Sequence, residues 1–172
     1  MFLSISKFIL SVMIVLGISA CGYSPSAKNA RTVMGDKIST NVVISLQDPQ
    51  NTVIIKDALD KSIIEVFQAS LVPKDRSDTH LILSMNMPRY TPVVYDLNGF
   101  VTGYRMTVSL SIKSYHDGVS KNYTTRGNYD FTVAPNAIVT DQERLDAIGF
   151  ATVKAIRAFV AQVSAEGARA NK

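Results

Sequence analysis

The sequence predicts an α+β domain in which two helices cover one face of a four-stranded, mostly antiparallel sheet, in the order β-α-β-β-β-α. Four segments alternate apolar and polar residues with a period of two, which is typical of half-buried strands. Two longer segments repeat apolar residues every three or four positions, as amphipathic helices do. The chain has 172 residues, of which about 150 remain after an N-terminal export segment, so there is room for one domain.

The first 20 residues have the order of a signal peptide. Lys7 precedes an apolar run over residues 8–16, and the small residues Gly17, Ser19 and Ala20 follow. An apolar stretch of about 11 residues would rise about 16 Å as a helix, which is too short to span a bilayer comfortably. We therefore interpret residues 1–20 as an export signal.

The segment Ile18-Ser19-Ala20-Cys21 resembles the lipobox of bacterial lipoproteins. The resemblance implies that Cys21, the single cysteine of the chain, becomes the first residue of the mature protein and carries acyl chains such as palmitate. Gly22 follows it, and in such lipoproteins a residue other than Asp at this position favours the outer membrane. The alternative is that Cys21 is a core residue after ordinary cleavage.

The chain after the signal divides into three parts. Residues 21–36 are polar and contain Pro25 and Gly35, so we expect a lipidated N-terminus and a flexible tether there. Residues 37–166 are predicted to form the single α+β domain. Residues 167–172 are expected to be a frayed tail.

The first strand is predicted over residues 38–46, where Ile38, Thr40 and Val42 alternate with small polar residues. Asp48-Pro49 predicts the start of the first helix, because aspartate is a preferred N-cap and proline is tolerated at the first helical position. Apolar residues at helical spacing continue this pattern to Phe67.

Three more strands are predicted over residues 81–87, 104–113 and 123–133. His116-Asp117-Gly118 predicts a hairpin turn between the last two, because Asp-Gly tolerates the positive φ that tight turns require. Thr140 and Glu143 have the spacing of a capping box, which predicts the start of a long second helix.

With both helices on one face, the other face of the sheet is expected to be open and polar. It would carry mainly small hydrogen-bonding side chains with a few basic ones among them. The expected members are Ser39, Asn41, Ser45, Ser84, Asn86, Arg105, Thr107, Ser109, Ser111, Lys113, Thr124, Arg126 and Asn128. The alternative to a binding role is that this face is merely solvated.

Composition argues against several functional classes. Without Lys7 the mature part has 17 basic and 14 acidic side chains, and they are scattered, whereas nucleic-acid binders concentrate basic residues in a patch. His80 and His116 are the only histidines and stand in no catalytic motif. Too few ligands are available for a metal site of typical spacing. We therefore expect no enzyme, no cofactor and no metal.

One loop points to a partner. Residues 90–100 contain three aromatic residues and further apolar ones around a predicted hairpin tip, which is unusual for a solvated turn. Tyr90, Tyr95 and Phe100 are the candidates for contact with another protein or with lipid. The alternative is that these rings fold back over the edge of the core.

Several phrases of the sequence together suggest a family. They are Cys21-Gly22-Tyr23, Asp48-Pro49-Gln50-Asn51-Thr52, Tyr95-Asp96-Leu97-Asn98-Gly99 and Gly127-Asn128-Tyr129-Asp130-Phe131. With the lipobox and the order of elements, they resemble the LPS-assembly lipoprotein LptE family, particularly its campylobacterial-type members. The resemblance covers most of the mature chain.

The resemblance implies a lipid-anchored protein of the outer membrane, facing the periplasm, that plugs the barrel LptD and binds lipopolysaccharide or lipooligosaccharide during its insertion into the outer leaflet. Strand alternation suggests Arg105, Lys113, Lys121 and Arg126 as outward basic residues for lipopolysaccharide phosphates. One alternative is a lipid-anchored periplasmic binding or assembly module of another envelope or secretion complex. Another is a lipid-anchored hydrolase that uses His80 or His116.

Overall fold

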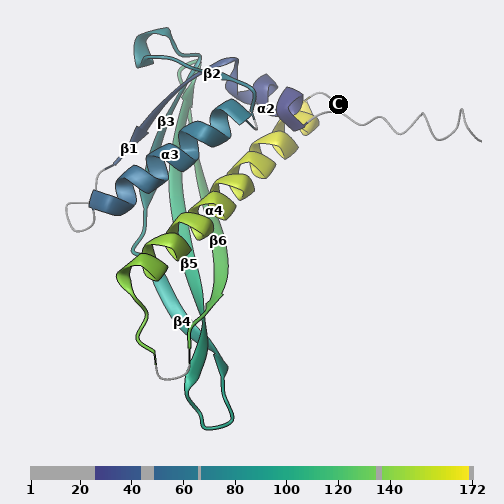
Figure 1. Cartoon of the computed structure of the whole chain (residues 1–172). Coiled ribbons are helices and arrows are strands. Elements are labelled where there is room, and N and C mark those ends of the chain that lie inside the picture. Colours follow the sequence, from purple (N-terminus) through teal and green to yellow (C-terminus); the bar gives the residue numbers. More distant parts are fainter. Residues whose placement is uncertain (1–25, 44–48, 66, 135–136, 171–172) are drawn as a thin grey trace, which may run out of the picture.

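The computed structural model describes residues 26–43, 49–65, 67–134 and 137–170 (Figure 1). In these ranges three α-helices and one short 3-10 helix accompany a six-stranded mixed sheet. The elements in chain order are α2 (Ser26–Met34), β1 (Lys37–Val42), α3 (Pro49–Glu65), β2 (Ser70–Leu71), η1 (Lys74–Arg76), β3 (Thr79–Met85), β4 (Arg89–Tyr95), β5 (Val101–His116), β6 (Val119–Thr132) and α4 (Asp141–Ala170). Cys21 and the predicted signal peptide lie outside the described residues.

The long strand β5 organises the sheet. Its C-terminal half pairs antiparallel with β3, its N-terminal half pairs antiparallel with β4, and nearly its whole length pairs with β6. Since β6 overlaps both partners, it must lie on the opposite edge of β5 from β3 and β4. Beyond β3, strand β1 pairs in parallel with both β3 and β2. The sheet is therefore mixed.

Strands β3 and β4 follow the same edge of β5 in succession. Met85 lies opposite Leu110 and Arg89 opposite Thr107, so the pairing resumes almost in register after residues 86–88. Pro88 lies in this gap and has no N–H to donate to a ladder, which accounts for the interruption. The hairpin of β4 and β5 then projects beyond the helices (Figure 1).

Helices α3 and α4 cover one face of the sheet (Figure 1). Leu81, Leu83, Val108 and Leu110 point to this face and are fully buried with Phe159 of α4. By length and composition α4 could span a membrane, but 56% of its most apolar window is buried in the domain, as in a core helix. Gly127 permits close contact between β6 and α4, because a Cβ there would lie 1.9 Å from the carbonyl oxygen of Ala151.

The predicted tether is wrong for residues 26–34, which form α2. Ala27, Ala30 and Met34 of this helix are buried, and the helix packs on α4. A Cβ at Gly167 would lie 1.7 Å from the carbonyl oxygen of Asn29, so the two backbones are in close contact. The predicted frayed tail is likewise wrong over residues 167–170, because α4 continues to Ala170.

The α+β class is confirmed, but the predicted set of two helices and four strands is not. α2 is an additional helix, and β2 and β4 are additional strands. The sequence did not predict β4 because Pro92 is typical of a loop, although proline is tolerated on an edge strand. β2 has only two residues, too few to show an alternation.

Several local predictions are confirmed. Asp117 and Gly118 both have positive φ, 48° and 75°, and join His116 to Val119 in a two-residue hairpin turn. The capping box is present: Thr140 N–H donates to Glu143 Oε2 at 2.8 Å, and Glu143 N–H donates to Thr140 Oγ1 at 3.2 Å. The pKa of Glu143 is lowered by the Thr140 N–H donor and, less strongly, by the Thr140 hydroxyl, which donates to Glu143 Oε2 at 2.8 Å.

Candidate functional site

The sheet face opposite the helices carries polar side chains in cross-strand rows. On β5 the residues of this face alternate with the buried ones, and the pairing aligns them with neighbours on both sides. Ser111 lies opposite Thr124 and Ser84, and Thr107 lies opposite Asn128 and Arg89. The predicted polar open face is therefore present along the central strands.

The upper part of this face differs from the prediction at Ser39. Ser39 is only 4% exposed because the segment after η1 covers it, and the hydroxyl of Ser39 donates to Ser77 Oγ at 2.9 Å. Ser39 Oγ also lies 2.7 Å from His80 Nδ1. Burial, and secondarily the charge of Lys74, lowers the pKa of His80. The sequence did not reveal this pair, because the two residues meet only through the parallel register of β1 and β3.

The other histidine holds elements together. His116 Nδ1 lies 2.9 Å from Thr79 Oγ1 and 3.0 Å from the carbonyl oxygen of Asp78. Thr79 Oγ1 donates in turn to the Met34 carbonyl at the end of α2. Because this donation uses the threonine proton, His116 Nδ1 must carry a proton to hydrogen-bond with both oxygens. His116 thus links β5 to β3 and, through Thr79, to α2.

The four basic residues suggested for lipopolysaccharide contact do not lie on one face. Arg105, Lys113 and Arg126 are on the open face, opposite Asp130, Asn122 and Ser109 respectively. The predicted outward position of Lys121 is wrong. Lys121 lies on the helix-covered face with Tyr123, and its Nζ lies 3.0 Å from Glu166 Oε2 on α4. Tyr123 also donates to this oxygen at 3.1 Å, and burial, reinforced by the charge of Glu166, raises the pKa of Tyr123.

The three outward cations differ in availability. Arg105 binds Asp130 through two parallel hydrogen bonds of 2.7 Å each, which lower the pKa of Asp130 and occupy the guanidinium fork. Lys113 and Arg126 are exposed and make no ion pair within the described part of the chain. Arg89, which the sequence analysis did not select, is exposed on the same face opposite Thr107. Its strand had been read as a loop, so alternation could not assign it.

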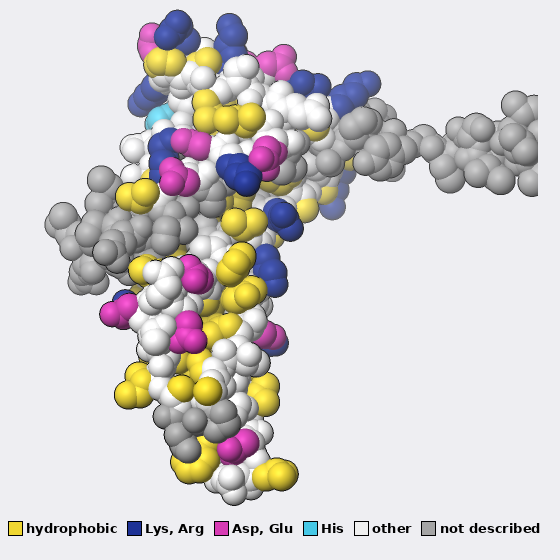
Figure 2. Space-filling model, in the orientation of Figure 1, with side chains coloured by type: hydrophobic (Ala, Val, Ile, Leu, Met, Phe, Trp, Pro, Cys, Tyr) yellow, Lys and Arg dark blue, Asp and Glu magenta, His cyan; other side chains and the backbone are white. Residues whose placement is uncertain are grey.

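The projecting end of the molecule forms a second candidate surface, which we call the apolar end: residues 90–104 of the β4–β5 hairpin and residues 137–140 before α4. Tyr90, Tyr95 and Phe100 are all exposed here. Val93, Val94, Leu97 and Ile138 are exposed as well. In Figure 2 hydrophobic side chains gather around the lower tip, where no Lys or Arg is visible.

A small pocket at the opposite end of the molecule is the third candidate for a functional site. It has a volume of about 210 Å³ and lies between α2 and the β5–β6 hairpin, with Val33, His116 and Tyr123 among its lining residues. Among the described residues no group of three or more His, Cys, Asp or Glu side chains is placed to hold a metal ion.

Comparisons with known proteins concern both sequence and fold. The family model described as LptE, lipopolysaccharide-assembly, matches residues 40–163. None of the curated proteins matches the sequence significantly. A putative lipoprotein from Caulobacter crescentus CB15 has a similar structure, with a TM-score of 0.55, 12% identity, and coverage of 84% of this chain and 96% of that one.

Two further solved structures are similar in fold. The rare lipoprotein B from Shewanella oneidensis has a TM-score of 0.53 and 11% identity, with 79% of this chain and 99% of that one covered. An uncharacterized lipoprotein B from Nitrosomonas europaea has a TM-score of 0.50 and 13% identity, with 77% and 84% covered. At these identities the likeness concerns the fold.

Proposed function

The chain belongs to the LptE family of lipopolysaccharide-assembly proteins, and from that premise we propose that it is an outer-membrane lipoprotein that forms a complex with an LptD-like β-barrel, plugs it, and helps to place lipopolysaccharide in the outer leaflet. On this proposal Cys21 carries the lipid anchor and the domain enters the barrel from the periplasmic side. Its role is binding and assembly without catalysis.

The observation that carries the proposal is the polar open face of the sheet. A plug in a water-filled lumen meets a polar wall and needs hydrogen-bonding side chains on its surface. The rows around Thr107, Ser109 and Ser111 supply such groups, while the apolar faces of the sheet and helices are turned toward each other. The shape also suits a lumen, since the sheet extends along the length of α4, whose 30 residues span about 45 Å (Figure 1).

The same face offers cations for phosphate groups of lipopolysaccharide or lipooligosaccharide. We propose Lys113 and Arg126 as the phosphate contacts, with Arg89 as a further one, because each is exposed and unpaired by any described carboxylate. Arg105 can contact a phosphate group only if it releases Asp130, because the Asp130 carboxylate accepts the two hydrogen bonds of its guanidinium group. Lys121 is not among them, because it lies on the other face beside Glu166.

A pull-down of the protein from outer membranes in mild detergent tests the complex, with mass spectrometry of the proteins that co-elute at comparable amount. We expect a stoichiometric large barrel. The variant Ser109→Trp places a bulky ring in the middle of the open face and is expected to reduce the barrel yield at least severalfold while the circular-dichroism spectrum is unchanged.

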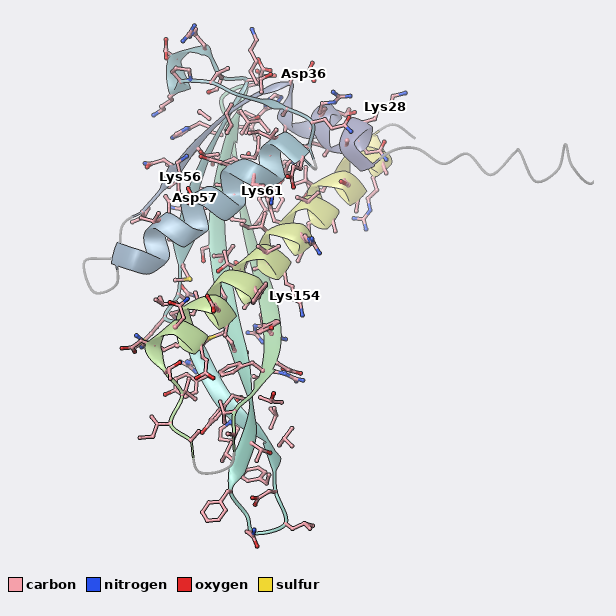
Figure 3. The ribbon with its side chains drawn as sticks, viewed as in Figure 1. Lys28, Asp36, Lys56, Asp57, Lys61 and Lys154 are labelled. Carbon is pink, nitrogen blue, oxygen red and sulfur yellow. The ribbon has the colours of Figure 1, made fainter. Side chains whose placement is uncertain are left out.

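Lys61→Trp is the matched control, because Lys61 lies on the helix side of the molecule and its side chain is 72% exposed (Figure 3). This variant should retain the barrel. If no barrel co-elutes and another envelope complex does, the plug proposal fails and the chain serves that complex as a binding or assembly module.

A further inference from the structure

Within the described residues, β6 is an edge strand whose outer side has no neighbour, because it pairs with β5 alone. Val133 N–H donates to the Thr102 carbonyl at 3.0 Å, so in this register the odd-numbered residues of β6 direct their backbone groups to β5. The even-numbered residues from 120 to 132 then direct theirs away from the sheet, and all of them are exposed. The outer side of β6 therefore offers a row of N–H and C=O groups that no other described strand uses.

The two other edges of the sheet are blunted by short length, proline or irregular pairing, and β6 shows none of these three features. β2 has only two residues, and β4 contains Pro92 and two register shifts. The register of β6 with β5 is unshifted from Val119 to Thr132, and this stretch contains no proline. Its only lysine, Lys121, is turned to Glu166 on the helix side. A long, regular edge of this kind is a template for another extended chain.

Helix α4 runs along this edge and makes it one side of a groove. Near one end of β6, the Phe150 ring of α4 stacks on Tyr129 with 4.7 Å between the ring centres. Near the other end, a groove of about 350 Å³ is lined by residues of both elements, among them Asn122, Thr124, Gln162 and Arg169. Figure 1 shows α4 passing along β6 between these points. An exposed strand edge with side-chain pockets beside it is the means by which several domains bind extended peptides.

The helix side of the groove is basic. Lys154 and Arg169 are both exposed, lie about 22 Å apart along α4, and make no ion pair within the described part of the chain. Lys154 Nζ lies 5.5 Å from the centre of the Tyr129 ring, which places it beside β6. Glu166, the carboxylate among the residues that line the groove, is already paired with Lys121. A segment with acidic side chains facing α4 therefore complements the groove.

From these observations we propose that β6 and α4 form a groove that binds an extended, acidic segment of a partner protein, which pairs with β6 as a seventh strand of the sheet. About seven residues of this segment would reach from Lys154 to Arg169, since a strand rises about 3.3 Å per residue. The backbone groups of β6 supply affinity, and the two cations select the charge. The inference rests on the proposed function for its partner: the segment belongs to the LptD-like barrel and lies beside the plug in the lumen.

A second copy of this chain does not suit the edge. α4 lies directly over β6, since a Cβ at Gly127 would lie 1.9 Å from the carbonyl oxygen of Ala151. Antiparallel pairing of two β6 strands would place two α4 helices on one face about 5 Å apart, whereas packed helices need about 8–10 Å. An extended segment without a helix of its own avoids this clash.

Amide-resolved hydrogen exchange tests the strand addition on the complex that is purified from outer membranes with the lipidated protein. Fragmentation mass spectrometry would compare the bound protein with the free protein in the same detergent. We expect the even-numbered amides from 122 to 130 to exchange at least tenfold more slowly in the complex. The odd-numbered amides of β6, which are already bonded to β5, should exchange slowly in both states.

A matched pair of variants separates the backbone contact from the side chain. Thr124→Pro removes an outward N–H of β6 and is compatible with an edge strand, whereas Thr124→Ala keeps this N–H. We expect Thr124→Pro to reduce the amount of co-purified barrel at least fivefold and Thr124→Ala to change it less than twofold, with unchanged circular-dichroism spectra. If Thr124→Pro fails to fold, the exchange pattern of the unsubstituted complex decides.

A charge reversal tests the choice of an acidic segment. Lys154→Glu combined with Arg169→Glu should reduce the amount of co-purified barrel at least fivefold. Lys61→Glu combined with Lys74→Glu is the control, because it reverses two exposed cations on α3 and η1, outside the groove, and it should leave the amount unchanged. Equal losses for the two double variants would refute the acidic segment.

Photocrosslinking in cells identifies the segment, with p-benzoylphenylalanine in place of Asn122 and mass spectrometry of the linked peptide. We expect the link to lie in an acidic segment of the barrel. Links to a second copy of the chain, or equal exchange of the even-numbered amides in the free and bound protein, would overturn the proposal. Protection of these amides by another envelope protein, with no barrel present, would refute the proposed function and support the groove.

Discussion

At the scale of single residues, partners decide which charges are available. Three basic residues alternate onto the open face as the sequence predicts, but only two of them are free of a described carboxylate. Arg105 and Asp130 neutralise each other, while Lys121 turns to Glu166 on the other side of the sheet. The capacity of the face to bind phosphate therefore depends on Lys113, Arg126 and Arg89 more than on the count of basic residues.

This arrangement predicts opposite effects for neighbouring substitutions. Arg126→Glu should weaken lipopolysaccharide binding about fivefold, because one exposed charged contact is worth about 1 kcal/mol. Asp130→Asn should strengthen binding, because it releases the guanidinium of Arg105. Titration of the detergent-solubilised protein with fluorescent lipopolysaccharide at fixed ionic strength would measure both.

Lys121→Gln is the control for these two variants, since it removes a cation from the covered face. It should leave lipopolysaccharide affinity unchanged. Equal losses for Lys121→Gln and Arg126→Glu would mean that net charge, and not the open face, attracts the ligand.

At the scale of elements, the helix missed by sequence analysis is part of the folded unit. α2 has little apolar surface of its own, with Ala27, Ala30 and Met34 as its buried apolar side chains. Its place is determined by α4, where Gly167 lets the backbones approach. Asp78 closes the connection to β1 by accepting the N–H groups of Asp36 and Lys37 at 3.0 and 2.9 Å.

Removal of α2 should therefore cost stability. A chain that starts at residue 37, the boundary predicted from sequence, should unfold with about 3–5 kcal/mol less free energy than one that starts at residue 26, because burial of one methionine and two alanines is lost. Urea unfolding followed by circular dichroism would compare the two. Equal midpoints and slopes would show that α2 is dispensable for the stability of the rest of the domain.

At the scale of the whole molecule, β5 joins a well-packed end to a projecting one. Its C-terminal half is held between β3 and β6 and covered by α4, whereas its N-terminal half continues into the apolar end. Every residue of β4 is exposed, and its pairing is broken twice between Pro92 and Tyr95. The two ends can therefore differ greatly in local stability.

Hydrogen exchange should report this difference. Amides of β5 between residues 108 and 114 should exchange only on global unfolding, whereas those of β4 should exchange on the order of a hundredfold faster or more, through local opening. Exchange followed by mass spectrometry on the detergent-solubilised protein would measure it. Uniform protection of both strands would mean that the apolar end is as stable as the core.

The sequence by itself determined the features that depend on near neighbours along the chain. Spacings of four residues or fewer were enough to predict the α+β class, the two-sided strands, the Asp117-Gly118 turn and the capping box before α4. The short sequence segments that resemble the LptE family could also be recognised in the sequence. Tertiary structure alone decided the rest. It made a helix of residues 26–34, turned Lys121 to Glu166, buried Ser39 beneath Ser77 and set β3 and β4 on one edge of β5. Each of these depends on partners distant in sequence. The contact of Gly167 with Asn29 shows why, because a helix of nine residues with three buried apolar side chains is ordered by the surface that receives it.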